Sequence, residues 1–408
     1  RLKILFVKLY FTPNITFMAP LKFALLRERK TPPDRRAVLS PISMSKAQEA
    51  FPKASFIVEA SPIRVFPDVA YEKAEFEIKE DISEADVMLG VKEVPIEALI
   101  PNKKYFFFSH TIKKQPYNRD LLKAVLVKNI ELYDHEVITR KSGLRLIGFG
   151  RYAGLVGAYN AFRAYGKRHK TFDLPPANTL TDVSALIAQL KKIELPAIKI
   201  CLSGSGKVAG GAQEILEAMG IKKVTIEEYL TKEFKKPVYC KIGVMDYAKR
   251  KDGVKGSLAQ FIKDPTGYET NFLCFAKVSQ VFIAGHFYGD GAPYLFTRGE
   301  AKSKDFNIEV IADISCDIDG PVASTLRAST IADPFYGYDP QTEKEVAFDA
   351  PGAITVMAVD NLPCELPKDA SEGFGELFVE RVLPAFFNDD KDGILYRARM
   401  TKDGKLTK

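Results

Sequence analysis

The hydrophobic pattern of the chain alternates between short apolar runs and segments whose apolar positions recur at helical spacing. The runs are apolar at successive positions, which is typical of strands covered by helices on both faces. In the first part of the chain the predicted strands are residues 23–26, 56–59, 87–91, 105–108 and 146–149. The second set is residues 198–202, 224–226, 281–284, 310–314 and 354–359. This order predicts an α/β fold with two Rossmann-like domains, each a parallel sheet flanked by helices, and an active-site cleft between them.

Two predicted helices separate the sets of strands. Residues 152–167 carry small side chains on one helical face, which permits a close crossing with another backbone. Residues 182–192 carry apolar side chains at i, i+3, i+4 and i+7, and Pro196 stops this helix. The predicted domains are a substrate and catalytic domain over 18–150, completed by 364–408, and a dinucleotide-binding domain over 151–363.

Length and composition narrow the class of protein. The 408 residues fit two domains, and 46% hydrophobic with 27% charged residues excludes a disordered or fibrous chain. Lysine and arginine number 59 against 52 acidic residues, a net charge of +7 that is spread along the chain. A nucleic-acid partner is therefore not indicated. The excess of positive charge suits an enzyme that binds carboxylates or phosphates.

The cysteines and the chain start bear on location. The five cysteines are scattered without a CxxC pair, so we predict neither disulfides nor a structural metal, and a reducing, cytoplasmic compartment. The uncharged run 9–21 is interrupted by Pro13 and Pro20 and is too short to span a bilayer, so no membrane partner is expected. We expect Met18 to be the natural start and the 17 residues before it to be a leader without structural consequence.

A glycine-rich turn follows the predicted strand 198–202 and precedes a helical pattern. Strand, glycine turn and helix in this order form a dinucleotide site, where helix N–H groups meet a pyrophosphate. An ordinary glycine-rich connection is the alternative. The predicted cofactor-binding residues of the turn are Gly204, Ser205, Gly206, Lys207 and Val208.

The sequence offers two candidates for the residue that holds the adenosine ribose. Glu227 lies close to the expected distance after the glycine turn, but Thr225, at the end of strand 224–226, is the predicted cofactor-binding residue. Lys222 and Lys223 stand nearby, and cations without a carboxylate favour the 2'-phosphate of NADP. The cofactor is therefore NADP or NAD, with a slight preference for NADP.

Two ionisable residues follow predicted strands of the first set. Lys92 follows strand 87–91, and His110 stands just after strand 105–108. Ligands of open parallel sheets bind beyond the carboxyl ends of the strands, so the two side chains are candidates for a proton-shuttling pair at a carbonyl or imine. A hydrogen-bonded strand-end histidine and a solvated lysine are the alternatives.

Other candidates are charged residues near strand ends. Arg36 follows the first strand and its loop, and its guanidinium suits a substrate carboxylate, with a surface charge as the alternative. Asp360 and Leu362 follow strand 354–359 and are candidate cofactor-binding residues of the cleft. The acidic residues of 313–319 lack the spacing of a calcium loop, so we predict the polar rim of a cleft there and no metal.

In order and spacing, several segments together resemble the alanine dehydrogenase and saccharopine dehydrogenase superfamily, most closely its lysine-ketoglutarate reductase branch. The resemblance covers roughly residues 24–387. The segments are residues 81–92, 107–113, 149–154, 204–213, 311–317 and 360–363.

The resemblance implies roles for individual residues. Lys92 and His110 match the acid-base lysine and histidine of the family. Arg36 matches its substrate-carboxylate arginine, and Arg145 a second arginine of the cleft. Asp360 matches an aspartate beside the nicotinamide, and Lys113 is a further candidate for a substrate carboxylate.

The function that this resemblance implies is the reversible reductive condensation of L-lysine with 2-oxoglutarate to saccharopine with NADPH. Alternatives are the NAD-dependent, lysine-forming saccharopine dehydrogenase, an alanine dehydrogenase-like enzyme, and a nicotinamide-binding module without chemistry. The glutamate-forming half of the bifunctional animal and plant proteins has no counterpart before Lys408, so a monofunctional enzyme is expected. The oligomeric state stays open.

Overall fold

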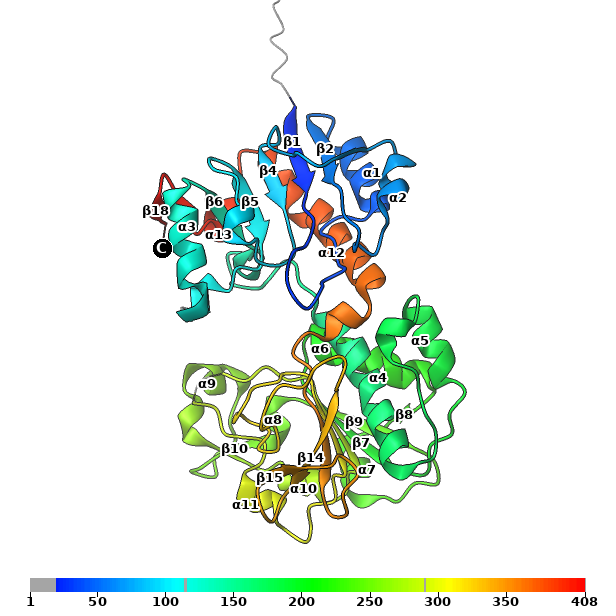
Figure 1. The fold of residues 1–408 in the computed structure, drawn as a ribbon. Coiled ribbons are helices and arrows are strands. Elements are labelled where there is room, and N and C mark those ends of the chain that lie inside the picture. Colours follow the sequence, from blue (N-terminus) through cyan, green and yellow to red (C-terminus); the bar gives the residue numbers. More distant parts are fainter. Residues whose placement is uncertain (1–19, 114–115, 290, 408) are drawn as a thin grey trace, which may run out of the picture.

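The computed structural model describes residues 20–113, 116–289 and 291–407. Two separate β-sheets organise these residues, and helices pack against both (Figure 1). The α/β architecture predicted from the sequence is confirmed. The expected start at Met18 and the leader before it lie outside the described residues.

The first sheet is parallel throughout and has the strand order β3-β2-β1-β4-β5-β6. Its strands are β1 (Leu21–Leu25), β2 (Ala54–Glu59), β3 (Glu77–Lys79), β4 (Val87–Leu89), β5 (Lys104–Phe107) and β6 (Glu131–Asp134). The helices between them are α1 (Pro41–Ala50), α2 (Asp68–Glu72) and α3 (Arg119–Val127), with 3-10 turns η1 (Ile96–Ala98), η2 (Thr111–Lys113), η3 (Pro116–Asn118) and η4 (His135–Val137).

The C-terminal part of the chain returns to the first sheet (Figure 1). Phe374 and Phe378 of α12 are fully buried in the same apolar cluster as Phe23 of β1. Beyond α13, Met400 N donates to Leu132 O of β6 at 2.7 Å. The elements are η7 (Leu362–Glu365), α12 (Pro367–Arg381), η8 (Leu383–Phe386), α13 (Ile394–Ala398), β17 (Thr401–Lys402) and β18 (Lys405–Leu406). The boundaries 18–150, 151–363 and 364–408 stay predictions.

The second sheet has the order β15-β14-β16-β13-β12-β7-β9-β8. It is parallel from β16 to β8, and β14 and β15 add an antiparallel hairpin at one edge. Its strands are β7 (Lys199–Ser203), β8 (Lys222–Lys223), β9 (Val238–Ile242), β12 (Val281–Ala284), β13 (Val310–Asp313), β14 (Phe335–Asp339), β15 (Lys344–Val346) and β16 (Ile354–Met357).

Short elements complete this half of the chain. A separate hairpin pairs β10 (Ala248–Arg250) with β11 (Tyr268–Thr270). The helices are α4 (Gly150–His169), α5 (Val183–Leu190), α6 (Lys207–Ala218), α7 (Ile226–Thr231), α8 (Val244–Tyr247), α9 (Leu258–Lys263), α10 (Leu273–Ala276) and α11 (Arg298–Ala301), with η5 (Ala177–Thr179) and η6 (Pro265–Gly267).

The small residues predicted on one face of 152–167 serve the contact between α4 and α6. A Cβ at Gly154 would collide with the carbonyl oxygen of Val208, and a Cβ at Gly211 with that of Arg151. Glycine therefore lets the two helix backbones touch directly. The helix predicted over 152–167 is confirmed as α4, and the helix over 182–192 as α5.

Two predicted strands are wrong. Residues 146–149 form an irregular segment before α4, because Leu146 N pairs with Ile138 O in a local hairpin instead of joining the sheet. Residues 224–226 are not a strand, because Thr225 caps α7 with a side chain that accepts from Glu228 N at 3.2 Å. The strands of the two sheets that the sequence did not predict are β3, β6, β8, β9, β14 and β15, and the strands of the hairpins β10–β11 and β17–β18 were not predicted either. Several of them are short or carry charged residues.

One further property follows from the helices. Among the described residues, none of the helices has both the length and the apolar character needed to cross a membrane.

The α4–α6 contact gives a paired prediction. Gly211→Ala should destabilise the protein by about 1–3 kcal/mol, because the new methyl group forces the two helix backbones apart. Its neighbour Gly210 lies on the same helix, and no described atom comes within 4 Å of a Cβ built there. Gly210→Ala should therefore stabilise by up to about 1 kcal/mol through helix propensity. Urea unfolding of both variants checks this, and equal effects would contradict it.

Candidate active site

The candidate site lies along the carboxyl edge of the first sheet, where four neighbouring strands end. Each strand is followed within a few residues by an ionisable side chain: Glu28 after β1, Lys92 after β4, His110 after β5 and Glu136 after β6. Beyond β4 and β5, Phe108 N still donates to Val91 O at 3.0 Å. The structure therefore places Lys92 and His110 at the same edge of the sheet, one and two residues beyond the hydrogen-bonded Val91 and Phe108.

Lys92 is held through its backbone by a buried carboxylate. Glu28 accepts hydrogen bonds from Val91 N at 2.6 Å and Lys92 N at 2.9 Å. Burial raises the pKa of Glu28 to about 7, with Asp34 adding to the effect. Burial and the nearby Arg36 guanidinium lower the pKa of Lys92, which increases its neutral fraction.

His110 is positioned by a strained backbone and an acidic neighbour. Its φ of 54° lies in the left-handed region, which is uncommon for a residue other than glycine. Its Nδ1 lies 3.4 Å from Glu136 Oε2. The other carboxylate oxygen of Glu136 accepts from Arg145 Nη2 at 3.2 Å. Glu136 thus joins the predicted acid-base histidine to one predicted substrate arginine.

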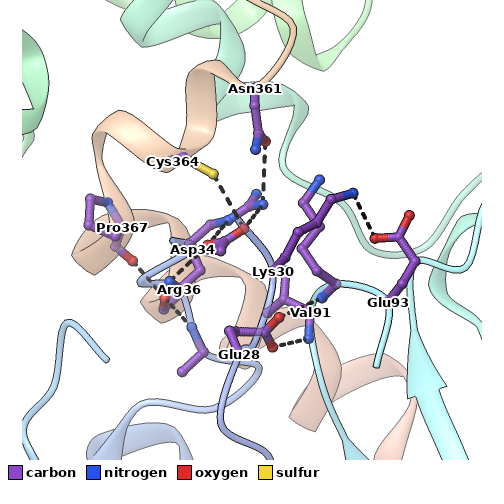
Figure 2. Close-up of polar contacts among 12 residues, drawn as sticks. Glu28, Lys30, Asp34, Arg36, Val91, Glu93, Asn361, Cys364 and Pro367 are labelled. Carbon is purple, nitrogen blue, oxygen red and sulfur yellow. Dashed lines mark hydrogen bonds and ion pairs between the residues drawn. The ribbon is translucent and has the colours of Figure 1, made fainter. Parts of the chain in front are cut away.

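Arg36 is buried and paired, which sequence analysis did not predict (Figure 2). Its Nε and Nη2 donate to the two oxygens of Asp34 at 3.0 and 2.6 Å. Burial alone would raise the pKa of Asp34, but the guanidinium lowers it to about 2. The Arg36 guanidinium also lies over the ring of Phe149, 4.3 Å from its centroid.

The Arg36–Asp34 pair contacts the segment that leaves the second sheet (Figure 2). Arg36 Nη2 donates to Asn361 Oδ1 at 3.4 Å, and Cys364 Sγ donates to Asp34 Oδ2 at 3.3 Å. Burial raises the pKa of the Cys364 thiol to about 12, so the thiol keeps its proton. Nη1 of Arg36 has no hydrogen-bond partner among the described residues, and it can offer two hydrogens to a substrate carboxylate.

The glycine turn fits a dinucleotide. Gly204 has a φ of +107°, and a Cβ there would collide with Gly285 O, so only glycine fits. Gly206 is the N-cap of α6, where no side chain among the described residues caps the helix. No described atom lies within 4 Å of a Cβ built at Gly206, and Ser205 and Lys207 are exposed. These open helix N–H groups suit a pyrophosphate.

The glycine turn also lies near the substrate side of the candidate site. Burial and the charges of Arg381 and Arg145 lower the pKa of Lys207. A Cβ at Gly150 would lie 3.4 Å from side-chain atoms of both Lys207 and Val208. The start of α4, which follows Phe149, therefore touches the predicted pyrophosphate turn.

The structure does not bring Thr225 to the glycine turn. Thr225 caps α7, after β8 at the far edge of the sheet, and β9 lies between β8 and β7. The strand end beside the turn belongs to β9, because Gly204 N donates to Ile242 O at 2.8 Å. Just beyond β9, Asp246 accepts from Gly243 N at 2.7 Å. Asp246 is the carboxylate that follows the neighbouring strand.

The remaining predicted site residues are Asp360, Leu362 and Lys113. Asp360 is exposed beyond β16, two residues before the buried Leu362. Leu362 packs in the apolar core with its side chain, so only its backbone can reach a cofactor. Lys113 ends η2, and nothing is described of its side chain.

In the described ranges, no group of three or more histidine, cysteine, aspartate or glutamate side chains is arranged so that it could hold a metal ion. Asp313 is buried and accepts from the hydroxyls of Ser315 and Thr325, both at 2.6 Å. It organises the turn after β13.

Sequence analysis missed Glu28, Asp34 and Glu136. Glu28 stands close behind the first strand, so the rule that selected Lys92 and His110 could have selected it. Asp34 stands two residues before Arg36, a spacing that suits a local ion pair. Glu136 follows β6, whose short sequence Glu131–Asp134 gave little strand signal.

The comparisons with known proteins agree with one another. The family described as "Alanine dehydrogenase/PNT, N-terminal domain" matches residues 24–156. The chain is 29% identical over 406 residues to alpha-aminoadipic semialdehyde synthase, mitochondrial, of Mus musculus, a match that covers 88% of this chain and 43% of the relative. It is 25% identical over 382 residues to saccharopine dehydrogenase [NAD(+), L-lysine-forming] of Yarrowia lipolytica, covering 90% and 92%.

Among solved structures, L-alanine dehydrogenase has the same fold, with a TM-score of 0.61, 15% identity and coverage of 95% and 96% of the two chains. The chain is thus similar to proteins of the alanine dehydrogenase and saccharopine dehydrogenase superfamily, and the resemblance predicted from its sequence is confirmed. It spans less than half the length of the synthase relatives that it matches.

Glu28 gives a prediction about pH. In the folded protein Glu28 has a pKa of about 7, whereas an unfolded glutamate has a pKa of about 4.5. Between these pH values only the folded state keeps the proton, so the free energy of unfolding should fall by about 3 kcal/mol as the pH rises from 4.5 to 7. Glu28→Gln cannot titrate and should lose this part of the pH dependence. Unfolding at several pH values measures the difference from wild type. Glu80→Gln, which removes an exposed glutamate, is the control, and parallel profiles for wild type and Glu28→Gln would contradict the prediction.

Proposed function

We propose that this protein is an NAD(P)-dependent oxidoreductase of lysine metabolism that condenses L-lysine with 2-oxoglutarate to saccharopine. The observation that supports it most is the row of Lys92, His110 and Glu136 at one sheet edge, with Arg145 joined to Glu136. The names of the relatives support the same reaction class.

The net reaction consumes an amine, a ketone, one hydride and one proton, and it releases water. Lys92, whose lowered pKa increases the neutral fraction available as a base, takes a proton from the substrate ammonium. The free amine attacks the ketone and forms a carbinolamine. His110 gives a proton to the carbinolamine oxygen, so that water leaves and a protonated imine forms. A reduced nicotinamide nucleotide held at the glycine turn would supply the hydride for reduction of the protonated imine to the secondary amine.

The arginines bind and orient the carboxylates. Saccharopine has three carboxylates, and we assign one to the Nη1 edge of Arg36, one to Arg145 and one to Lys113. Arg36 is pre-oriented because Asp34 holds the other side of its guanidinium. Holding the reactants in one orientation supplies a large part of the catalysis.

The decisive assay follows nucleotide oxidation by absorbance, with NADH and NADPH in parallel. Each nucleotide is tested with lysine plus 2-oxoglutarate and with pyruvate plus ammonia. Turnover with the first substrate pair supports the proposal. Turnover only with pyruvate and ammonia would indicate an alanine dehydrogenase-like enzyme. Nucleotide binding without turnover of either pair would indicate a binding module.

The acid-base role of His110 predicts a large loss of rate. His110→Gln should lower kcat by about 10²–10⁴-fold, because the carbinolamine then loses its proton donor. His169→Gln is a matched control, since His169 also faces a glutamate, with Nε2 3.1 Å from Glu309 Oε2, but at the opposite end of α4 from the glycine turn. A rate unchanged by His110→Gln would overturn the assignment.

For the cofactor, we propose that Asp246 holds the adenosine ribose and that NAD is preferred. A carboxylate after the strand next to the glycine strand binds ribose hydroxyls and repels a 2'-phosphate. Asp246→Asn should weaken NADH binding by about 10-fold and narrow the difference between NADH and NADPH. Fluorescence titration measures both affinities.

Glu227→Gln is the control for this cofactor prediction, because Glu227 is the exposed carboxylate of α7 that sequence spacing suggested. If Glu227→Gln loses NADH binding and Asp246→Asn does not, the ribose binds to Glu227 at the start of α7 and not to Asp246.

A further inference from the structure

A basic hollow lies beside the candidate active site, between the C-terminal helices and the hairpin that carries Arg145. It has a volume of about 390 Å³. We call it the basic hollow, and it is lined by Arg140, Lys141, Leu146, Arg381, Asp392, Ile394 and Arg397. Four of these side chains are cationic, and one is a carboxylate.

Two of the arginines are fixed in place by backbone carbonyls. Arg397 donates to Thr139 O from Nε at 3.1 Å and from Nη2 at 2.7 Å. Arg381, at the end of α12, donates from Nη1 to Leu146 O at 3.3 Å. Both arginines are half-buried. A carbonyl that accepts from a guanidinium holds it in one orientation, so these contacts preorganise two of the cationic side chains of the hollow.

The other two cations stand at the hairpin. Arg140 and Lys141 are exposed, and neither forms an ion pair with a carboxylate in the part of the chain that the structure describes. Of the acids close by, Glu380 lies 3.5 Å from Arg381 Nε, and Asp392 belongs to the hollow itself. Cationic side chains outnumber carboxylates in the lining of the hollow, which favours anions.

The hairpin lies between this hollow and the candidate active site. Thr139 pairs with Arg145, and Arg140 N donates to Leu144 O at 2.9 Å. Neighbouring residues of an extended segment face opposite sides. Arg140 lines the hollow, whereas Arg145 reaches Glu136, so one short hairpin has the basic hollow on one side and the substrate arginine on the other.

We propose that the basic hollow binds a small multivalent anion, a phosphate ester or a polycarboxylate, and that its occupation fixes the hairpin that holds Arg145. Anion binding itself does not depend on the proposed reaction. Its effect on the substrate rests on the proposed function, because it assumes that Arg145 binds a carboxylate of 2-oxoglutarate. Occupation then strengthens the binding of 2-oxoglutarate.

The binding test uses the full chain, titrated calorimetrically with inorganic phosphate and separately with citrate, at an ionic strength held constant with KCl. Arg140→Gln with Lys141→Gln should weaken the affinity by about 10-fold or more, since two of the four cations are lost. The matched control is Lys191→Gln with Lys192→Gln, an adjacent pair of exposed lysines after α5. Binding of phosphate alone or citrate alone assigns the anion class, and binding of neither overturns the proposal.

A second variant separates the basic hollow from the substrate site. Arg145→Gln should keep the anion affinity of wild type, because Arg145 faces Glu136. Loss of anion binding in Arg145→Gln, with wild-type affinity in the Arg140 and Lys141 double variant, would place the anion in the active site and overturn the proposal.

The coupling is measured as the dissociation constant of 2-oxoglutarate, with and without a saturating concentration of the bound anion. Wild type should bind 2-oxoglutarate about fivefold more tightly with the anion present, and the double variant should show no change. An anion that binds in the hollow but leaves this constant unchanged overturns the coupling. The measurement needs no turnover, so failure of the proposed reaction shows separately, in the nucleotide assay.

Discussion

Buried charge behind the carboxyl edge of the first sheet is the constraint on which the site depends. Arg36 and Asp34 are each only 3% exposed, so their charges are satisfied by each other and by few other groups. A charge in such surroundings acts strongly on its neighbours, because little water screens it. Removing either member would leave an uncompensated buried ion, which costs several kcal/mol. The pair therefore fixes the local backbone and sets the electrostatic surroundings of Lys92.

The same constraint joins the two halves of the chain. Asn361 and Cys364 come from the segment after β16, and they contact the Arg36–Asp34 pair. Phe149, beneath the Arg36 guanidinium, directly precedes α4, whose first turn touches the glycine turn. The substrate-binding arginine and the nucleotide turn are thus connected by two short paths. A shift between the sheets would change the contacts of Arg36.

The sequence was sufficient to predict the α/β class and the strand-end positions of Lys92 and His110, because fully covered strands have long apolar runs and functional residues follow their ends. It was also sufficient for the glycine turn and for the close helix contact through Gly154. It was not sufficient for β6 and β9. These strands contain charged residues, and without β6 the pattern gave no reason to select Glu136.

Strand order limited the prediction of the ribose site. The sequence rule assumes that the strand after the glycine helix lies beside the glycine strand, as in the first sheet, where β2 lies next to β1. In the second sheet β8 is an edge strand of two residues, and β9 takes the inner place. A two-residue strand can bury little surface, so the longer β9 is the better neighbour for β7. The choice of ribose residue therefore follows from sheet topology, which a count along the chain does not reveal.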